Sequence, residues 1–153
     1  MQGTLSCRLC LLAFITLTTL SAGPATSFAE QGGESSVVIS GLPDATGLVM
    51  DNRGNAYMVG KCCGQVLIVP PGGTPMEYAR IEGTPTVLAV NRLRTVFVGT
   101  ESGAIHAILP DGTVSRVHAC GSPVTGLSLD RDGNLFIAMG NGSIIRIARS
   151  DLD

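Results

Sequence analysis

Charge is scarce in this chain. Charged residues make up 14% of its 153 residues, and its 10 basic side chains are nearly balanced by 12 acidic ones. Proteins that bind nucleic acid or anionic lipid need a dense basic patch to meet the phosphate groups. The sequence offers no such patch, so we expect neither a nucleic-acid partner nor attachment to an anionic membrane surface.

Long apolar runs are also scarce. The run over residues 9–20 is too short to cross a bilayer as a helix, and a small-x-small cleavage pattern, Ser27-Phe28-Ala29, follows it. These features predict a cleaved signal peptide and a secreted or periplasmic protein; an uncleaved membrane anchor is the alternative. The expected organisation is a signal peptide over residues 1–29, a flexible lead-in over residues 30–36 and one domain over residues 37–153.

The chain does contain a repeat of about forty residues. Gly-x-Pro occurs at residues 41–43, 83–85 and 121–123, and each copy precedes a short β-prone block. No helical period or capping sequence appears after residue 29, so we expect an all-β domain. A period of this length means that each unit buries its apolar faces only against its neighbours.

Each repeat is expected to hold four short antiparallel strands, which is the unit of a β-propeller blade. The second strand of each repeat is almost continuously apolar, as in Val96-Phe97-Val98-Gly99, which predicts cover on both sides. The expected strands begin with residues 47–50, 56–59, 66–69 and 76–81, continue with 87–90, 96–99, 105–109 and 114–119, and end with 126–129, 135–138 and 144–147.

Two turn motifs recur in register. Asp51-Asn52-Arg53-Gly54-Asn55 matches Asp130-Arg131-Asp132-Gly133-Asn134, and Pro110-Asp111-Gly112-Thr113 closes a third strand. With these motifs the chain resembles the NHL-repeat and gluconolactonase-like (senescence marker protein family) six-bladed propellers, of which it would hold three blades. The resemblance implies a small-molecule site at the channel mouth and, in the gluconolactonase-like enzymes, a divalent cation (calcium, zinc or manganese) that supports lactone hydrolysis.

In such propellers the mouth lies on the face that carries the links between blades and the turns between second and third strands. On this chain that face would carry Asp44, Lys61, Glu101 and Asn141, with Thr84, Thr86, Ser102, Ser122 and Thr125 nearby. Of these residues, Asp44 alone lies at the channel end of an inner strand and has the chemistry of a metal ligand. The function we expect is an exported module that binds a small molecule or a protein partner there. The alternative is a divalent-metal-dependent lactone or ester hydrolase.

The cysteines are the least ordinary residues of the mature chain. Cys62 and Cys63 are adjacent in an expected turn, and Cys120 lies in another repeat. A bridge between neighbours is strained, because consecutive α-carbons lie about 3.8 Å apart while disulfides prefer roughly 4.4 to 6.8 Å. A vicinal bridge, a bridge to Cys120 and free thiols all stay open, as does a redox role.

Two histidines and one acidic turn could suggest catalysis or metal binding, but structural roles are favoured for them. His106 aligns with Leu67 and Ile145, which favours a packed strand residue, and His118 is expected on an outer strand. Neither has a nucleophile and a carboxylate placed beside it by the sequence, so no triad is indicated. Residues 130–134 could open a calcium loop, but Leu135 stands where an EF-hand needs glycine, so turn stabilisation is favoured.

The strand count predicts assembly. Residues 37–40 precede the first Gly-x-Pro as a fourth strand would, whereas the third repeat ends after its third strand. Closed propellers use about four to eight blades, so three blades would leave apolar faces in water. We expect a homodimer that completes a six-bladed ring, or association with a second propeller fragment.

Overall fold

The structure is a computed structural model that describes residues 40, 42 and 44–152. This part of the chain forms eleven β-strands and one short 3₁₀ turn, η1 (Arg149–Asp151), which confirms the all-β prediction. Within it, no helix has the length and apolar character needed to cross a membrane. The predicted signal peptide, the lead-in and all of the expected strand 37–40 except Ser40 lie outside the described residues.

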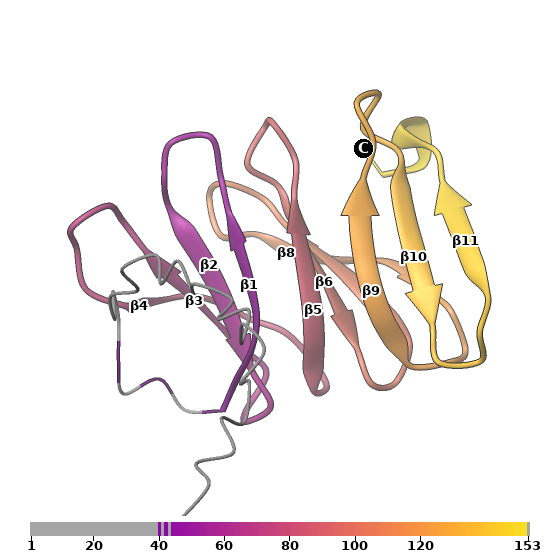
Figure 1. Ribbon diagram of the computed structural model, residues 1–153, viewed down its shortest axis with the longest axis horizontal. Helices are drawn as coiled ribbons and strands as arrows, with labels where there is room; N and C mark the ends of the chain where they lie inside the picture. The colour runs from indigo at the N-terminus through magenta and orange to yellow at the C-terminus, as the bar shows by residue number, and fades with distance from the viewer. Residues whose placement is uncertain (1–39, 41, 43, 153) are drawn as a thin grey trace, which may run out of the picture. The chain divides into compact units, whose positions relative to one another are not determined.

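The strands form three antiparallel sheets in chain order, as the propeller prediction requires, and we call these sheets blades (Figure 1). Blade 1 holds β1 (Ala45–Met50), β2 (Ala56–Gly60), β3 (Gln65–Val69) and β4 (Met76–Arg80). Blade 2 holds β5 (Pro85–Val90), β6 (Val96–Thr100), β7 (Ala104–Ile108) and β8 (Val114–Ala119). Blade 3 holds β9 (Val124–Leu129), β10 (Leu135–Met139) and β11 (Ile144–Ile147).

The first hairpin turn of each blade is stabilised by the side chain of its first residue. The Asp130 carboxylate accepts the backbone N–H of Asp132 and of Asn134, each at 2.9 Å. Asp51 and Asn91 do the same in the other blades. This confirms that residues 130–134 are a turn that the aspartate stabilises.

These turns also require one residue with a left-handed backbone conformation, that is, a positive φ. Gly54 and Gly133 supply it with φ of 81° and 88°, but the middle blade places Arg94 there with φ 67°. A residue with a Cβ is disfavoured in this conformation. The turn of blade 2 therefore contains local strain that its two counterparts avoid.

Two hydrophobic cores hold the blades together. The inner strands β1, β5 and β9 contact one another in sequence, so each core lies between adjacent blades. The first core joins Tyr57, Val59 and Val66 of blade 1 to Leu88, Val96, Val98 and Ile108 of blade 2. The second joins Phe97, Ile105 and Ala107 of blade 2 to Val124, Leu135, Ile137 and Met139 of blade 3.

The second strands follow the predicted pattern in blades 1 and 2 and depart from it in blade 3. Every residue of β6 is buried, and the central residues of β2 are buried as well. In β10, Leu135 and Ile137 are buried but Phe136 is exposed. Phe136 points to the side of blade 3 opposite blade 2, where no described strand covers it.

Candidate functional site

The predicted mouth-face residues lie where the second hairpin turn of a blade meets the link that enters its inner strand. A backbone hydrogen bond joins the two segments in every blade: Lys61 to Asp44, Glu101 to Thr84, and Gly140 to Pro123, with N···O distances of 3.2, 3.0 and 2.8 Å. The four side chains singled out from the sequence, Asp44, Lys61, Glu101 and Asn141, are all exposed. This geometry brings Asp44 next to Lys61 in blade 1 and places Glu101 at the position of Lys61 in blade 2. Asn141 lies one residue further along its turn, at the position of Cys62.

The described residues do not fit the divalent cation that the family resemblance implies. They contain no group of three His, Cys, Asp or Glu side chains that could hold a metal ion. Asp44 is therefore a single carboxylate without the companions that a calcium or zinc site needs. The Asn141 side chain accepts the backbone N–H of Ser143 at 3.0 Å, so it also stabilises its own turn.

The adjacent thiols lie on the second hairpin turn of blade 1. The Sγ atoms of Cys62 and Cys63 are 2.9 Å apart, and both residues are exposed. The hydrogen bond and the charge interaction with Cys63 raise the pKa of the Cys62 thiol, so little of it is thiolate at neutral pH. Burial raises the pKa of the half-buried Cys120, which packs against the core between blades 2 and 3. Which of these thiols form a bridge stays a prediction.

The two histidines occupy ordinary strand positions. His106 is buried in β7, and its Nε2 has no hydrogen-bond partner among the described residues. Burial, followed by the nearby positive charge of Arg116, lowers its pKa, so it is neutral at pH 7. His118 lies exposed on β8, as the sequence predicted for an outer strand.

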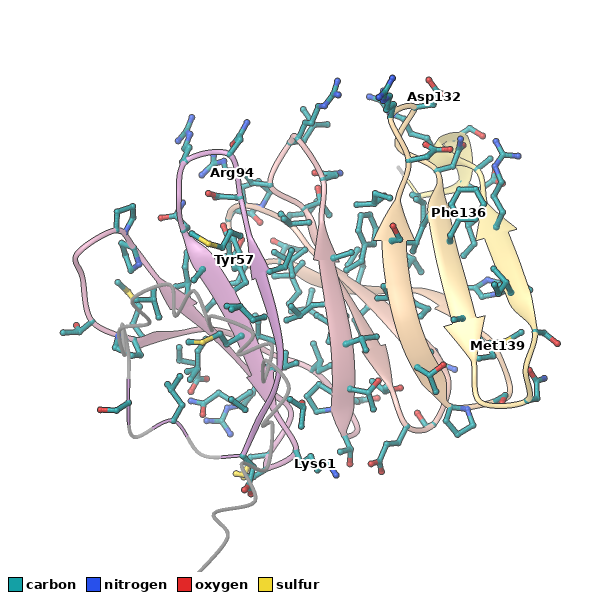
Figure 2. All side chains as sticks on the ribbon, viewed as in Figure 1. Tyr57, Lys61, Arg94, Asp132, Phe136 and Met139 are labelled. Carbon is teal, nitrogen blue, oxygen red and sulfur yellow. The ribbon has the colours of Figure 1, made fainter. Side chains whose placement is uncertain are left out.

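Sequence reasoning missed a cavity that the described residues enclose. A space of about 640 Å³ opens between blades 2 and 3, and we call it the interblade cavity. Its apolar lining is formed by Val90, Leu93, Phe97, Ala107, Leu109, Leu129 and Leu152, and its charged lining by Arg92, Arg131, Arg149, Asp130 and Asp132. It lies near the first hairpin turns, at the end of the sheets opposite the predicted mouth. Figure 2 shows Arg94 and Asp132 at that end and Lys61 at the other.

Two small side chains of blade 2 widen the interblade cavity. Ala107 pairs with Ser115 across β7 and β8, at the place where Ile68 pairs with Met76 in blade 1. Exchanging Ile and Met for Ala and Ser removes several methyl-sized groups from the face that blade 2 turns toward blade 3. A comparison of equivalent residues in successive repeats could have found this difference, but only once the register was known.

Arginines outnumber carboxylates in the cavity lining by three to two. The Asp130 carboxylate accepts hydrogen bonds from the side chain and backbone of Asn134, at 2.7 and 2.9 Å, and these bonds lower its pKa. Arg92, Arg131 and Arg149 form no ion pair among the described residues. The Cδ of Arg149 packs near Gly133, where an added Cβ would lie 3.1 Å from it. The entrance can therefore receive an anionic group.

The sheets, links and turns together define a β-propeller architecture, represented in the described residues by three blades. No family model matches the chain, and no curated protein matches it. Its structural neighbours are β-propellers and include gluconolactonase-like and virginiamycin B lyase structures, which confirms the predicted fold.

Three solved structures illustrate the similarity. Virginiamycin B lyase from Staphylococcus aureus is 12% identical with a TM-score of 0.56, and the match covers 69% of this chain and 41% of that chain. A gluconolactonase-like protein is 16% identical with a TM-score of 0.59, covering 69% and 46%. A nidogen/laminin complex contains a chain that is 21% identical with a TM-score of 0.63, covering 70% and 45%. The matched region thus spans less than half of each of these neighbours.

Proposed function

We propose that this protein is an exported binding module, and that the interblade cavity takes a small amphipathic ligand with an apolar body and a carboxylate head. The observation that carries the proposal is the cavity itself. Its volume of about 640 Å³ falls within the range of about 300 to 1,000 Å³ typical of ligand pockets.

The two parts of the cavity lining suit the two parts of such a ligand. Phe97, Leu129 and Leu152 offer apolar surface to a hydrocarbon or aromatic body. The guanidinium groups at the entrance can hold a carboxylate through two parallel hydrogen bonds. A medium-chain fatty acid or an aromatic acid has this combination of groups.

The mouth face is a second binding surface, separate from the interblade cavity. Asp44, Lys61, Glu101 and Asn141 would offer polar contacts to a protein partner or a polar small molecule there. Lactone or ester hydrolysis is the weaker alternative, because the described residues do not hold the carboxylate cluster that a catalytic cation needs. We therefore propose no hydrolytic step.

Calorimetric titration with decanoate and with decanol tests the cavity, since the two probes share an apolar chain and differ in the charged head. The double variant A107I/S115M gives blade 2 side chains like those of blade 1 and narrows the cavity. We expect it to bind both probes more weakly while its circular dichroism spectrum stays unchanged. Unaltered decanoate binding in this variant would refute the cavity as the site.

The charged part of the site is tested by Arg149→Gln. We expect decanoate to bind about tenfold more weakly and decanol to bind as before, because a hydrogen bond to a charged group contributes about 1.5 to 3 kcal/mol. Arg53→Gln is the control, because Arg53 is an arginine on the first hairpin turn of blade 1 and does not line the cavity. Equal losses in both variants would indicate a general charge effect and contradict the proposed head-group contact.

A further inference from the structure

The outer blades present two apolar faces, which we define by their exposed residues. The leading face belongs to blade 1 and carries Leu48 and Met50. The trailing face belongs to blade 3 and carries Phe136 and Ile144. Exposed apolar surface of this kind marks a site of association.

The register of the sheets shows that both faces are repeats of surfaces that are buried elsewhere. Leu48 pairs with Met58 as Leu88 pairs with Val98, yet Leu48 is 64% exposed and Leu88 is 8% exposed. Ile144 pairs with Ala138 as Ile105 pairs with Gly99, yet Ile144 is 72% exposed and Ile105 is 0% exposed. The leading face is therefore the side of a blade that normally packs on the preceding blade, and the trailing face is the side that packs on the following one.

The two faces also complement each other in side-chain size. Between blades 2 and 3, Gly99 faces Val124 so closely that an added Cβ would lie 2.5 Å from a Val124 methyl group. The register places Ala138 at the position of Gly99, and Ala45 at the position of Val124. If the faces met, Ala138 would have one methyl group more than Gly99, and Ala45 opposite it would have two carbons fewer than Val124. The added and the missing volume would lie at the same place.

A second pair of positions agrees with this match. Between blades 1 and 2, an added Cβ on Gly47 would lie 3.6 Å from the Cγ of Leu88. On the outer faces Gly126 corresponds to Gly47 and Leu48 corresponds to Leu88. The same glycine and leucine pair would therefore form where the trailing face meets the leading face.

Polar groups on blade 3 repeat the pattern. The Thr86 hydroxyl donates to the carbonyl oxygen of Val124 in the next blade at 2.6 Å. Thr125 is its counterpart in blade 3, and it is exposed. The outer edge of β11 pairs with no described strand, whereas β3 and β7 pair with β4 and β8. Blade 3 thus keeps the hydrogen-bonding groups that a following blade would use.

We propose that a second copy of this chain binds head to tail, so that the trailing face of each copy covers the leading face of the other. Two copies of three blades make a closed six-bladed ring with two identical interfaces, which leaves no apolar face exposed. In this ring Asp44 of one copy lies on the blade that follows Asn141 of the other. The mouth face encircles a channel only when both copies are present.

Light scattering on the purified protein tests the assembly, and we expect about twice the monomer mass. Leu48→Glu places a charge on the leading face and should reduce the mass to that of a monomer while circular dichroism stays unchanged. Leu93→Glu is the matched control, because Leu93 is similarly exposed but lies on the first turn of blade 2, outside both faces. A monomeric parent protein, or equal effects of the two variants, would overturn the ring.

Gly142 gives an independent test. Its counterpart Gly103 lies so close to the following link that an added Cβ would be 2.5 Å from the carbonyl oxygen of Ser122, whereas a Cβ on Gly142 meets nothing within 4 Å in the single chain. An added Cβ on Gly103 would also lie 3.1 Å from the backbone nitrogen of Gly121. The register places Leu42 at the position of Gly121, so in the ring Leu42 of the partner copy would approach Gly142 in the same way. Gly142→Ala should therefore weaken the dimer at least tenfold by dilution light scattering.

Gly121→Ala is the control for Gly142→Ala. Gly121 also has a positive φ, 67° against 84°, and open space around its Cα. We expect this variant to dimerise like the parent protein. Equal dimer affinity in both variants would show that no link packs on Gly142, and the head-to-tail arrangement would be wrong.

Discussion

Replacing Gly64 by alanine tests how the second hairpin turn of blade 1 is held against the link that follows the blade. Gly64 accepts the backbone N–H of Ile81 at 2.9 Å, and its φ of 61° is left-handed. An added Cβ would overlap the carbonyl oxygen of Ile81 and lie 3.3 Å from that of Gly83. Both obstacles are backbone atoms, so no side chain can move aside to make room.

The expected loss of stability has two parts. A non-glycine residue at positive φ costs about 1 to 2 kcal/mol. Forcing an extra carbon into a packed site costs about 1 to 3 kcal/mol more. We therefore expect Gly64→Ala to lower the free energy of unfolding by about 2 to 5 kcal/mol. The variant should also displace Lys61 and Cys62, because they belong to the same turn.

Gly72→Ala separates the cost of the positive φ from the cost of the steric overlap. Gly72 has a φ of 68°, close to that of Gly64, but an added Cβ there meets nothing within 4 Å. It should lose only the conformational part, about 1 to 2 kcal/mol. Urea unfolding of the parent and both variants, followed by circular dichroism, gives the comparison. Equal losses in the two variants would refute the close packing of the turn on the link.

Three further predictions concern single features of the fold. Arg94→Gly should raise the free energy of unfolding by roughly 0.5 to 1 kcal/mol in urea titrations, because glycine removes the strain at φ 67°. Burial and the neighbouring Asp51 raise the pKa of Tyr57 to about 12, above its value of about 10 in the unfolded chain. The resulting stability is complete below pH 10 and falls by at most about 3 kcal/mol as the pH rises to 12; Tyr57→Phe should remove this fall in alkaline unfolding curves. If Cys62 and Cys63 form a vicinal bridge, peptide mapping without reductant should find one peptide about 2 Da lighter than its reduced form, whereas alkylation of both thiols would exclude the bridge.

Much of the fold could be predicted from local patterns. Asp51 and Asp130 stabilise their turns through bonds to residues only two and four positions away. Such turns depend on local residues, so their sequences identify them and the strands that they join.

The interblade cavity could not be predicted in this way. Ala107 and Ser115 are ordinary strand residues in the sequence, and only the register shows that they replace Ile68 and Met76 on one face. The three arginines at the entrance come from turns and a terminal segment of two different blades. Their proximity depends on how the blades pack, which involves contacts between residues far apart in the chain.

The sequence alone determined the repeat, the strands and the turns, because these depend on short apolar blocks and on turn hydrogen bonds between residues close together in the chain. Only the tertiary structure decided which faces are covered. Phe97 and Phe136 hold equivalent places in their repeats, yet Phe97 is 2% exposed and Phe136 is 37% exposed. Their surroundings differ because burial depends on whether a neighbouring blade packs against that side, and no residue carries that information by itself.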